Sequence, residues 1–257
     1  MSKRNGNGNS GLGKLFYAVI LTDRECDFGN IGLDNQRVHS INYNEIGALV
    51  SDHPRVDSIK LLRKNLTPYH HVVREAAKHF TTIPAKFGQI ARDAGEVSIA
   101  LRSNYGQIRQ ELSRLDGKVE MGFKVWWNVE NIFKYFIERD RVLKTRRDQL
   151  MVGGVSVSRM VQIEFGRYFH DRMEQVRREM TERMLATLPP GEAKIDEIHE
   201  ERMITNSQLL IKKDLQKPLE EAVDALCRAM GDEYSLKWDG PWPPFSFVDH
   251  VELHLGR

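Results

Sequence analysis

The sequence has little cysteine, no excess of charge of either sign and no apolar run near its start that could cross a bilayer. Its two cysteines, Cys26 and Cys227, match neither a disulfide framework nor a metal-ligand spacing. The 38 Lys and Arg residues against 36 Asp and Glu leave a formal net charge of +2, which provides no general attraction to nucleic acid or to an anionic membrane. The apolar run from Leu15 to Leu21 is far shorter than the roughly 20 residues of a membrane span. We therefore expect a cytoplasmic protein with reduced thiols and no lipid-membrane partner.

Patterns that would indicate catalysis or cofactor binding are also missing. The stretch Gly8–Lys14 has the spacing of a phosphate-binding loop, but no strand precedes it and Leu15 replaces the Ser or Thr that would hold magnesium. His71, Glu75 and His79 repeat at helical spacing, yet they do not form the H-E-x-x-H arrangement and no further ligand is near in sequence. No nucleophile elbow or pair of catalytic carboxylates is evident. We expect no enzyme, no bound metal and no cofactor.

Length and composition fit two globular domains. The chain of 257 residues exceeds one typical domain, and its 40% hydrophobic and 29% charged residues are ordinary for a folded protein. Residues 1–13 are rich in Gly, Asn and Ser and are expected to form a disordered tail. We predict an N-terminal α+β domain over residues 14–116 and a C-terminal domain over residues 117–257.

The predicted N-terminal domain begins with strands and continues with helices. Apolar patterns predict strands over residues 14–22, 37–41 and 46–50. A helix is predicted over Thr67–Phe80, because Thr67 suits an N-cap and Pro68 suits the first helical position. A second helix is expected from Glu96 to Leu115, ending at the turn dipeptide Asp116-Gly117.

The predicted C-terminal domain alternates strands with long helices. The clearest strand covers Lys118–Asn128, where alternation places Val119, Phe123, Val125 and Trp127 on the core face and Glu120 and Lys124 on the other. Further helices are predicted over 130–150, 159–188 and 215–230, with a break at Gly153-Gly154, and further strands over 194–199, 207–212 and 234–238. This βαββαβ order predicts a modified ferredoxin-like domain with long helices in its first crossover.

The longest predicted helix carries an apolar stripe. Its members are Val161, Phe165, Phe169, Met173, Val176, Met180 and Met184. Methionines at this spacing could form an adaptable binding groove, but the pattern is more typical of core packing, and we assign the stripe to the core.

Two basic clusters raise the alternative of an RNA-binding or regulatory ferredoxin-like protein. One extends from Arg139 to Arg147, and the other comprises Arg177, Arg178 and Arg183. Acidic residues are interleaved with both clusters, and the aromatic motif of RNA-binding sheets is absent. A solvated helix face is therefore the preferred interpretation, with no nucleic acid as partner.

The segment Gly240–Val248 combines three prolines with three aromatic side chains. Proline fixes an extended path and removes amide donors, while the rings supply contact area. Trp242, Phe245 and Phe247 are accordingly candidates either for contact with a protein partner or for locking the C-terminal tail over its own sheet.

These residues also carry a family resemblance. From Leu15 to Val248 the sequence resembles the gas vesicle protein L/F family, GvpF and GvpL. The most specific elements are Gly240–Val248, the strand Val119–Trp127, and Pro84 with Phe87-Gly88.

The resemblance implies a cytoplasmic, gas vesicle-associated accessory or minor structural protein without catalytic function. Its implied partners are the small hydrophobic shell protein GvpA and other gas vesicle accessory proteins. The family also looks two-domained, with an N-terminal α+β part and a modified ferredoxin-like C-terminal part. Whether the chain is of the F or L type, and whether it acts as chaperone, nucleator or shell component, is left open by the sequence.

Overall fold

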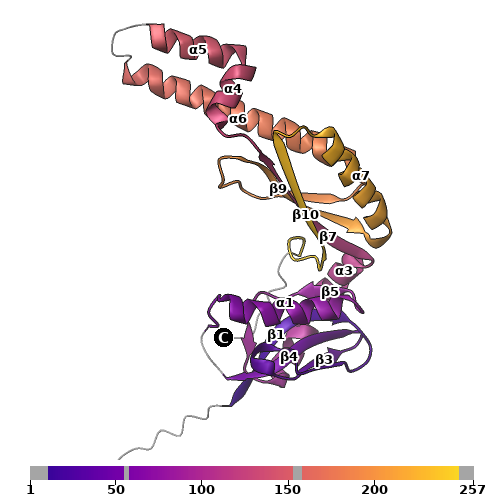
Figure 1. Cartoon of the computed structure of the whole chain (residues 1–257). Coiled ribbons are helices and arrows are strands. Elements are labelled where there is room, and N and C mark those ends of the chain that lie inside the picture. Colours follow the sequence, from indigo (N-terminus) through magenta and orange to yellow (C-terminus); the bar gives the residue numbers. More distant parts are fainter. Residues whose placement is uncertain (1–10, 55–57, 153–157, 249–257) are drawn as a thin grey trace, which may run out of the picture. The chain divides into compact units, whose positions relative to one another are not determined.

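The computed structural model describes residues 11–54, 58–152 and 158–248 (Figure 1). Most of the expected N-terminal tail and the expected break at Gly153-Gly154 lie outside the described residues. The chain forms two compact units. Unit 1 ends at Glu120 and also takes in the chain from Pro241 onward, whereas unit 2 runs from Met121 to Gly240. The sequence-based division assigned the segment from Pro241 to the C-terminal domain instead.

Unit 1 is built on a sheet in which β1 (Leu12–Leu21) is central. The other strands are β2 (Asp27–Gly29), β3 (Val38–Tyr43), β4 (Ile46–Pro54), β5 (Thr82–Pro84) and β6 (Ile90–Ala91). Their order is β2-β3-β4-β1-β5, and β6 also pairs with β1. β1 is antiparallel to both β4 and β5. The prediction of a strand buried on both faces is confirmed, because six consecutive residues from Leu15 to Ile20 are buried.

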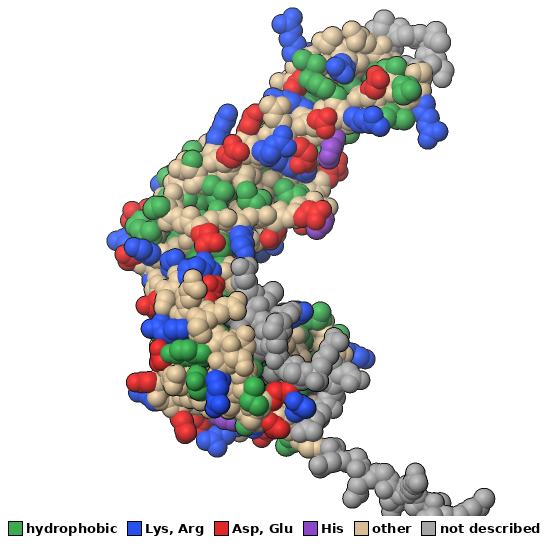
Figure 2. Space-filling view, turned by 180° about the vertical axis from the view of Figure 1, so that it is seen from behind, with side chains coloured by type: hydrophobic (Ala, Val, Ile, Leu, Met, Phe, Trp, Pro, Cys, Tyr) green, Lys and Arg blue, Asp and Glu red, His purple; other side chains and the backbone are tan. Residues whose placement is uncertain are grey.

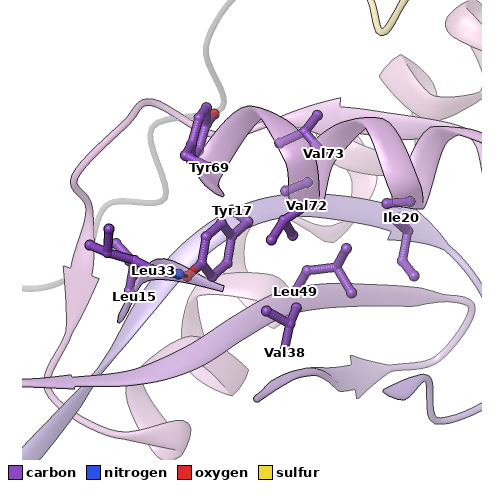
Figure 3. Packing of buried hydrophobic residues seen from close by; sticks show 11 residues of the cluster. Leu15, Tyr17, Ile20, Leu33, Val38, Leu49, Tyr69, Val72 and Val73 are labelled. Atoms are coloured by element: carbon purple, nitrogen blue, oxygen red, sulfur yellow. Dashed lines mark hydrogen bonds between the residues drawn. The ribbon is translucent and has the colours of Figure 1, made fainter. Parts of the chain in front are cut away.

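Helices cover the sheet of unit 1. They are α1 (Arg63–Ala77), α2 (Ala94–Ser103) and α3 (Tyr105–Leu115), with a short 3-10 turn η1 (Leu33–Asn35). Tyr69, Val72 and Val73 of α1 belong to one buried cluster with side chains of β1, and Figure 3 shows Val72 pointing from the helix toward the sheet. The hydroxyl of Tyr17 accepts a hydrogen bond from Leu33 N at 2.9 Å and lies 2.9 Å from Ser51 Oγ. Burial raises the pKa of Tyr17, so this hydroxyl stays protonated within the core.

The helix boundaries in unit 1 differ from those predicted. α1 begins at Arg63, four residues before Thr67, and the Thr67 hydroxyl donates backward to Arg63 O at 2.9 Å instead of capping the helix. The single helix expected from Glu96 is two helices separated at Asn104. At the C-terminal end of α2, the Asn104 side-chain amide donates to Ala100 O at 2.8 Å, beside the bond from the Asn104 backbone amide. The turn at Asp116-Gly117 is confirmed, with Gly117 at a φ of 68°.

Unit 2 contains a four-stranded sheet. Its strands are β7 (Lys118–Trp127), β8 (Glu192–Ile195), β9 (Met203–Lys212) and β10 (Tyr234–Trp242), in the order β10-β7-β9-β8. β7 agrees with the predicted strand, and its expected core residues Val119, Phe123, Val125 and Trp127 are buried while Lys124 is exposed. Glu120 departs from the prediction because its side chain is buried.

The helices of unit 2 are α4 (Ile132–Arg139), α5 (Arg141–Val152), α6 (Arg159–Thr187) and α7 (Gln216–Ala229), with a 3-10 turn η2 (Lys213–Leu215). α6 and α7 lie on the sheet, and the first part of α6 extends past it beside α5 (Figure 1). In the described part of the chain, no helix combines the length and apolar character of a membrane span. The predicted core stripe of α6 is only partly buried: Phe169, Met173 and Met184 are buried, but Val161 is 44% exposed. The stripe fails at Val161 because the sheet does not reach that part of the helix.

Arg177 of α6 is buried, which corrects the expectation of a solvated basic face at this position. Only 7% of the residue is exposed. Its guanidinium donates to Met203 O at 2.9 Å and to Glu201 O at 2.6 Å, and it also pairs with Glu174. The cation is tolerated because it satisfies backbone carbonyls at the start of β9. It therefore fixes α6 to the sheet and is not positioned to track a phosphate backbone.

We expect Arg177→Met to lower the free energy of unfolding by about 3 kcal/mol, because it leaves buried carbonyl groups without a donor. The matched control is Arg178→Met, on an exposed neighbour, with an expected change within about 0.5 kcal/mol. Urea unfolding of both variants measures the difference. Equal stability of the two variants would show that the Arg177 contacts contribute nothing net.

Candidate functional site

The predicted aromatic segment follows directly from β10 and folds into a short turn within unit 1. Phe245 N donates to Pro243 O at 2.7 Å, and Phe247 N donates to Pro244 O at 3.3 Å. Pro243 and Pro244 are buried. The three prolines thus direct the chain into a turn in which the amides of Phe245 and Phe247 find backbone partners.

Phe247 is the most deeply buried ring of this segment, with 2% of the residue exposed. Its carbonyl oxygen accepts a hydrogen bond from Arg114 Nη2 of α3 at 2.5 Å. Arg114 also pairs with Glu111, with 2.6 Å between Nη2 and Oε1. The segment is therefore held both by an apolar anchor and by a charged donor to its backbone.

Glu120 provides a second polar attachment, which explains why its side chain is buried. Its carboxylate accepts from Ser246 N at 2.7 Å and from Ser246 Oγ at 2.7 Å. Alternation along β7 had placed Glu120 on the solvent face, but no sequence pattern connects it with a residue 126 positions later. Hydrogen bonds to a charged acceptor compensate the loss of hydration of the carboxylate.

Trp242 and Phe245 contact α1 through residues one helical turn apart. The Arg74 guanidinium carbon lies 4.9 Å from the centroid of the Trp242 ring, and Trp242 is half-buried. Phe245 packs edge-to-face against His70, with 5.1 Å between ring centroids. Burial lowers the pKa of His70, so the ring is largely uncharged at pH 7. Locking over its own sheet was one of the two roles predicted for this segment, but its rings contact α1 and its backbone contacts α3.

An open apolar groove lies in unit 2 between α6, α7 and the sheet. Its volume is about 470 Å³. The apolar lining includes Val125, Met180, Met184, Ile204, Leu226 and Met230. This volume falls within the range of typical ligand-binding clefts, and methionine side chains adapt to irregular partners. The Met stripe that the sequence analysis assigned to the core thus also lines an open cleft at Met180 and Met184.

The groove also presents polar groups. Thr205 lies in the lining, and its buried Oγ1 has no hydrogen-bond partner in the described part of the structure. Glu179 and Arg183 of α6 line the groove as well. Glu179 accepts from Gln175 Nε2 at 2.9 Å, whereas Arg183 forms no ion pair with any described residue. A mainly apolar ligand would match this lining if it also carried a group that hydrogen-bonds to the Thr205 hydroxyl, or an acidic group that pairs with Arg183.

The other motifs considered in the sequence have structural roles. Lys14 lies in β1 and pairs with Asp52, with 2.5 Å between Nζ and Oδ1. Glu75 pairs with Lys78 at 2.6 Å, and His79 lies beyond the end of α1. Over the described ranges, no group of three or more His, Cys, Asp or Glu side chains is arranged to hold a metal ion.

Two solved structures define the class of fold. The crystal structure of gas vesicle protein GvpF from Anabaena sp. PCC7120 matches with a TM-score of 0.82 at 20% identity, covering 92% of this chain and 98% of that chain. GvpF from Microcystis aeruginosa matches with a TM-score of 0.75 at 19% identity, covering 92% and 99%. The chain thus has the mixed α+β fold of these proteins, with the two sheets described above.

Sequence relatives lead to the family. Gas vesicle protein F1 of Halobacterium salinarum is 25% identical over 244 residues, which cover 93% of each chain. Gas vesicle protein L of Haloferax mediterranei is 23% identical over 240 residues, covering 86% of this chain and 74% of that protein. Residues 13–249 match the gas vesicle synthesis protein GvpL/GvpF family, and the chain belongs to this family. The resemblance inferred from the sequence is confirmed. The family is one of gas vesicle assembly and is not known as a family of enzymes.

We expect the two ends of the aromatic segment to contribute differently to stability. Phe247→Ala should lower the free energy of unfolding by about 3 kcal/mol or more, as for a buried ring. Trp242→Ala should cost less, about 1–2 kcal/mol, because this partly exposed ring packs on the Arg74 guanidinium at the edge of the unit. Thermal and urea unfolding measure both values. A larger cost for Trp242→Ala than for Phe247→Ala would contradict the assignment of Phe247 as the anchor.

Proposed function

We propose that this protein is a non-enzymatic accessory or minor structural protein that binds the hydrophobic shell protein GvpA during gas vesicle assembly. Membership of the GvpL/GvpF family supports a role in assembly. The observation that carries the finer proposal is the open methionine-lined groove of unit 2. The proposal places this activity in the cytoplasm and at the gas vesicle, together with other gas vesicle accessory proteins.

The physical argument starts from the needs of an apolar shell subunit. Before it polymerises, such a subunit exposes hydrophobic surface and is prone to aggregation. A groove with Met180, Leu226 and Met230 along its walls would let an apolar side chain of a partner leave water by binding there. We propose that an apolar helical segment of the shell protein is the occupant.

The topology of unit 2 supports its interpretation as a modified ferredoxin-like domain. Along the chain, β7, β8, β9 and β10 are the first, second, third and fourth strands of this unit. In the sheet they lie side by side in the order β10-β7-β9-β8, which is fourth, first, third, second. Helices occur between the first and second strands and between the third and fourth. In this interpretation, α4 and α5 enlarge the first crossover, and the groove lies between the two sheet-packed helices α6 and α7.

For the aromatic segment, we propose that tail-locking is the main role of Phe247. Its burial and the hydrogen bond from Arg114 support this assignment. Phe245 has an intermediate role because its ring is only partly buried against α1. Trp242 exposes part of its ring and remains the member of the segment best suited to contact a partner.

The proposed binding of GvpA in the groove can be tested by filling the groove with a larger side chain. Ala229 lines the groove from α7, so Ala229→Phe should place a ring in the open space and weaken binding of GvpA by about tenfold or more, with little loss of stability. The matched control is Ala225→Phe on the same helix, because Ala225 is exposed and is not part of the lining. Binding of purified protein to detergent-solubilised GvpA, and vesicle formation in cells carrying the gene cluster, are the measurements.

Equal binding by the two phenylalanine variants would disprove the groove as the contact site. RNA binding is the outcome that would support the alternative function. It would appear as affinity for single-stranded RNA that falls steeply with salt concentration.

A further inference from the structure

The sheet of unit 2 has two edges of unequal length. One edge is β8, which has only four residues. The other edge is β10, which extends over nine residues. Short edge strands and prolines protect a sheet from pairing with another chain. Over the described ranges, no strand pairs with the outer side of β10, so this edge is long enough and open enough to accept a further strand.

The direction of the backbone groups in β10 follows from one hydrogen bond. Asn128 N, directly after β7, donates to Glu233 O, directly before β10, at 2.7 Å. Backbone groups of successive residues in a strand point to opposite sides, so Lys237 and Asp239 also direct theirs toward β7. The same antiparallel register places Asp239 opposite Gly122, and a Cβ atom added at Gly122 would lie only 2.8 Å from Asp239 Oδ1. This close approach agrees with the register.

The free edge of β10 is consequently formed by the backbone groups of Leu236, Trp238 and Gly240. Each of these residues carries an N–H donor. Pro241, which has none, falls on the β7 side and does not block the outer edge. Gly240 has a φ of 126°, so the regular strand geometry ends before it. A further strand would thus pair mainly with residues 236–239.

The side chains of β10 complement those of a second copy of the same strand. Lys237 and Asp239 lie on either side of Trp238 and are exposed. If two copies pair antiparallel with Trp238 opposite Trp238, each Lys237 lies opposite Asp239 of the other copy. Opposite charges in directly opposed positions stabilise a pair of strands, and like charges destabilise it. This register therefore creates the favourable pair twice.

Neighbouring registers are less favourable. A centre at Lys237 or at Asp239 places two identical charges opposite each other. A centre between two residues pairs outward-facing backbone groups with inward-facing ones, which breaks the hydrogen-bond ladder. Asp239 also has a partner within its own chain, but a carboxylate accepts from several donors. The pattern of the strand thus selects Trp238 as the two-fold centre.

Trp238 supplies apolar surface to this contact. Its side chain is half-buried, and it lies on the same face of β10 as Leu236. Leu236 lines a small hollow together with Cys227 and Met230 at the end of α7. Cross-strand aromatic pairs stabilise antiparallel strands beyond the area that they bury. Pairing of two Trp238 rings would therefore remove exposed apolar surface and add a favourable ring contact.

The charge of unit 2 does not oppose contact between copies. Residues 121–240 carry 20 Lys and Arg against 21 Asp and Glu, which leaves a net charge of −1. In Figure 2, side chains of both signs are interspersed over the visible surface of this unit. Long-range repulsion between two copies is therefore weak, and local charge pairs decide the register.

We propose that two copies of this protein associate through β10, paired antiparallel about Trp238, so that their unit 2 sheets join into one continuous sheet. Residues 236–239 do not line the groove, and the inference extends beyond the proposed binding of GvpA. The contact is short, so the association is reversible and weaker than that of an obligate dimer.

Zero-length crosslinking of the unmodified full-length chain tests the register. An equal mixture of unlabelled and isotope-labelled protein is treated with a carbodiimide, which joins a lysine amine to a carboxylate where the two groups are in contact. The expected product links Lys237 of one copy to Asp239 of the other and is recognised in mass spectrometry by its mixed isotope composition. Absence of this mixed product, or sedimentation of the protein as a monomer over a wide range of concentrations, would overturn the proposal.

Charge reversal gives a second test, read by sedimentation velocity. Lys237→Glu should weaken dimerisation by about tenfold or more, because the two-fold symmetry makes the substitution act twice. Asp239→Lys should weaken it similarly. An equal mixture of the two variants should dimerise again, since each strand then meets opposite charges on its partner. The matched control is Lys212→Glu at an exposed position of β9, which should leave the association unchanged.

The mixture experiment contradicts pairing about Trp238 if no dimers form while both variants keep the melting temperature of the unmodified protein. If Asp239→Lys does not fold, Lys237→Glu decides together with the crosslink, and dimerisation that is unaffected by Lys237→Glu overturns the proposal. Lys237→Glu should leave binding of GvpA intact, because Lys237 is not part of the groove lining. Measuring both properties on this variant separates a failure of this inference from a failure of the proposed function.

Discussion

Strand β1 can be stable only if both sides of its sheet are covered, because its side chains are apolar on both faces. The arrangement of unit 1 follows from this constraint. α1 supplies Tyr69, Val72 and Val73 to the cluster on one side, and the other helices contact the same strands. The hydroxyl of Tyr17 is accepted in the core because it has hydrogen-bond partners in Leu33 and Ser51. The C-terminal segment joins this core through Phe245, and Phe247 of the same segment is buried.

The helices of unit 2 cover their sheet less completely than those of unit 1. α6 and α7 cover the sheet but leave a groove lined by Met180 and Met230. α6 also extends past the sheet beneath it, and Met160 near its start is 67% exposed. The groove therefore originates in apolar helix surface that unit 2 leaves open. Exposed apolar surface of this kind is typical of interaction sites.

The two buried charged residues, Arg177 and Glu120, are held by hydrogen bonds to distant parts of the chain. The side-chain pattern of the sequence does not reveal these bonds. Arg177 donates to the carbonyls of Glu201 and Met203, and Glu120 accepts from the amide and hydroxyl of Ser246. In each case the charged group replaces lost hydration with hydrogen bonds to a distant part of the chain. These contacts position α6 on its sheet and attach the turn after β10 within unit 1.

The sequence by itself determined the elements whose patterns are local. Alternation located β7, the continuous apolar run located β1, and the specific motifs indicated the gas vesicle family, because each signal lies within about ten neighbouring residues. Caps were less predictable, since Thr67 had both a forward and a backward hydrogen-bonding option and only packing selected one. The tertiary structure alone decided that Glu120 and Arg177 are buried, that Trp242 and Phe245 meet α1, and that the methionine stripe borders an open groove. These features depend on pairing residues far apart in the chain, and a one-dimensional pattern does not encode which distant surface will cover a given side chain.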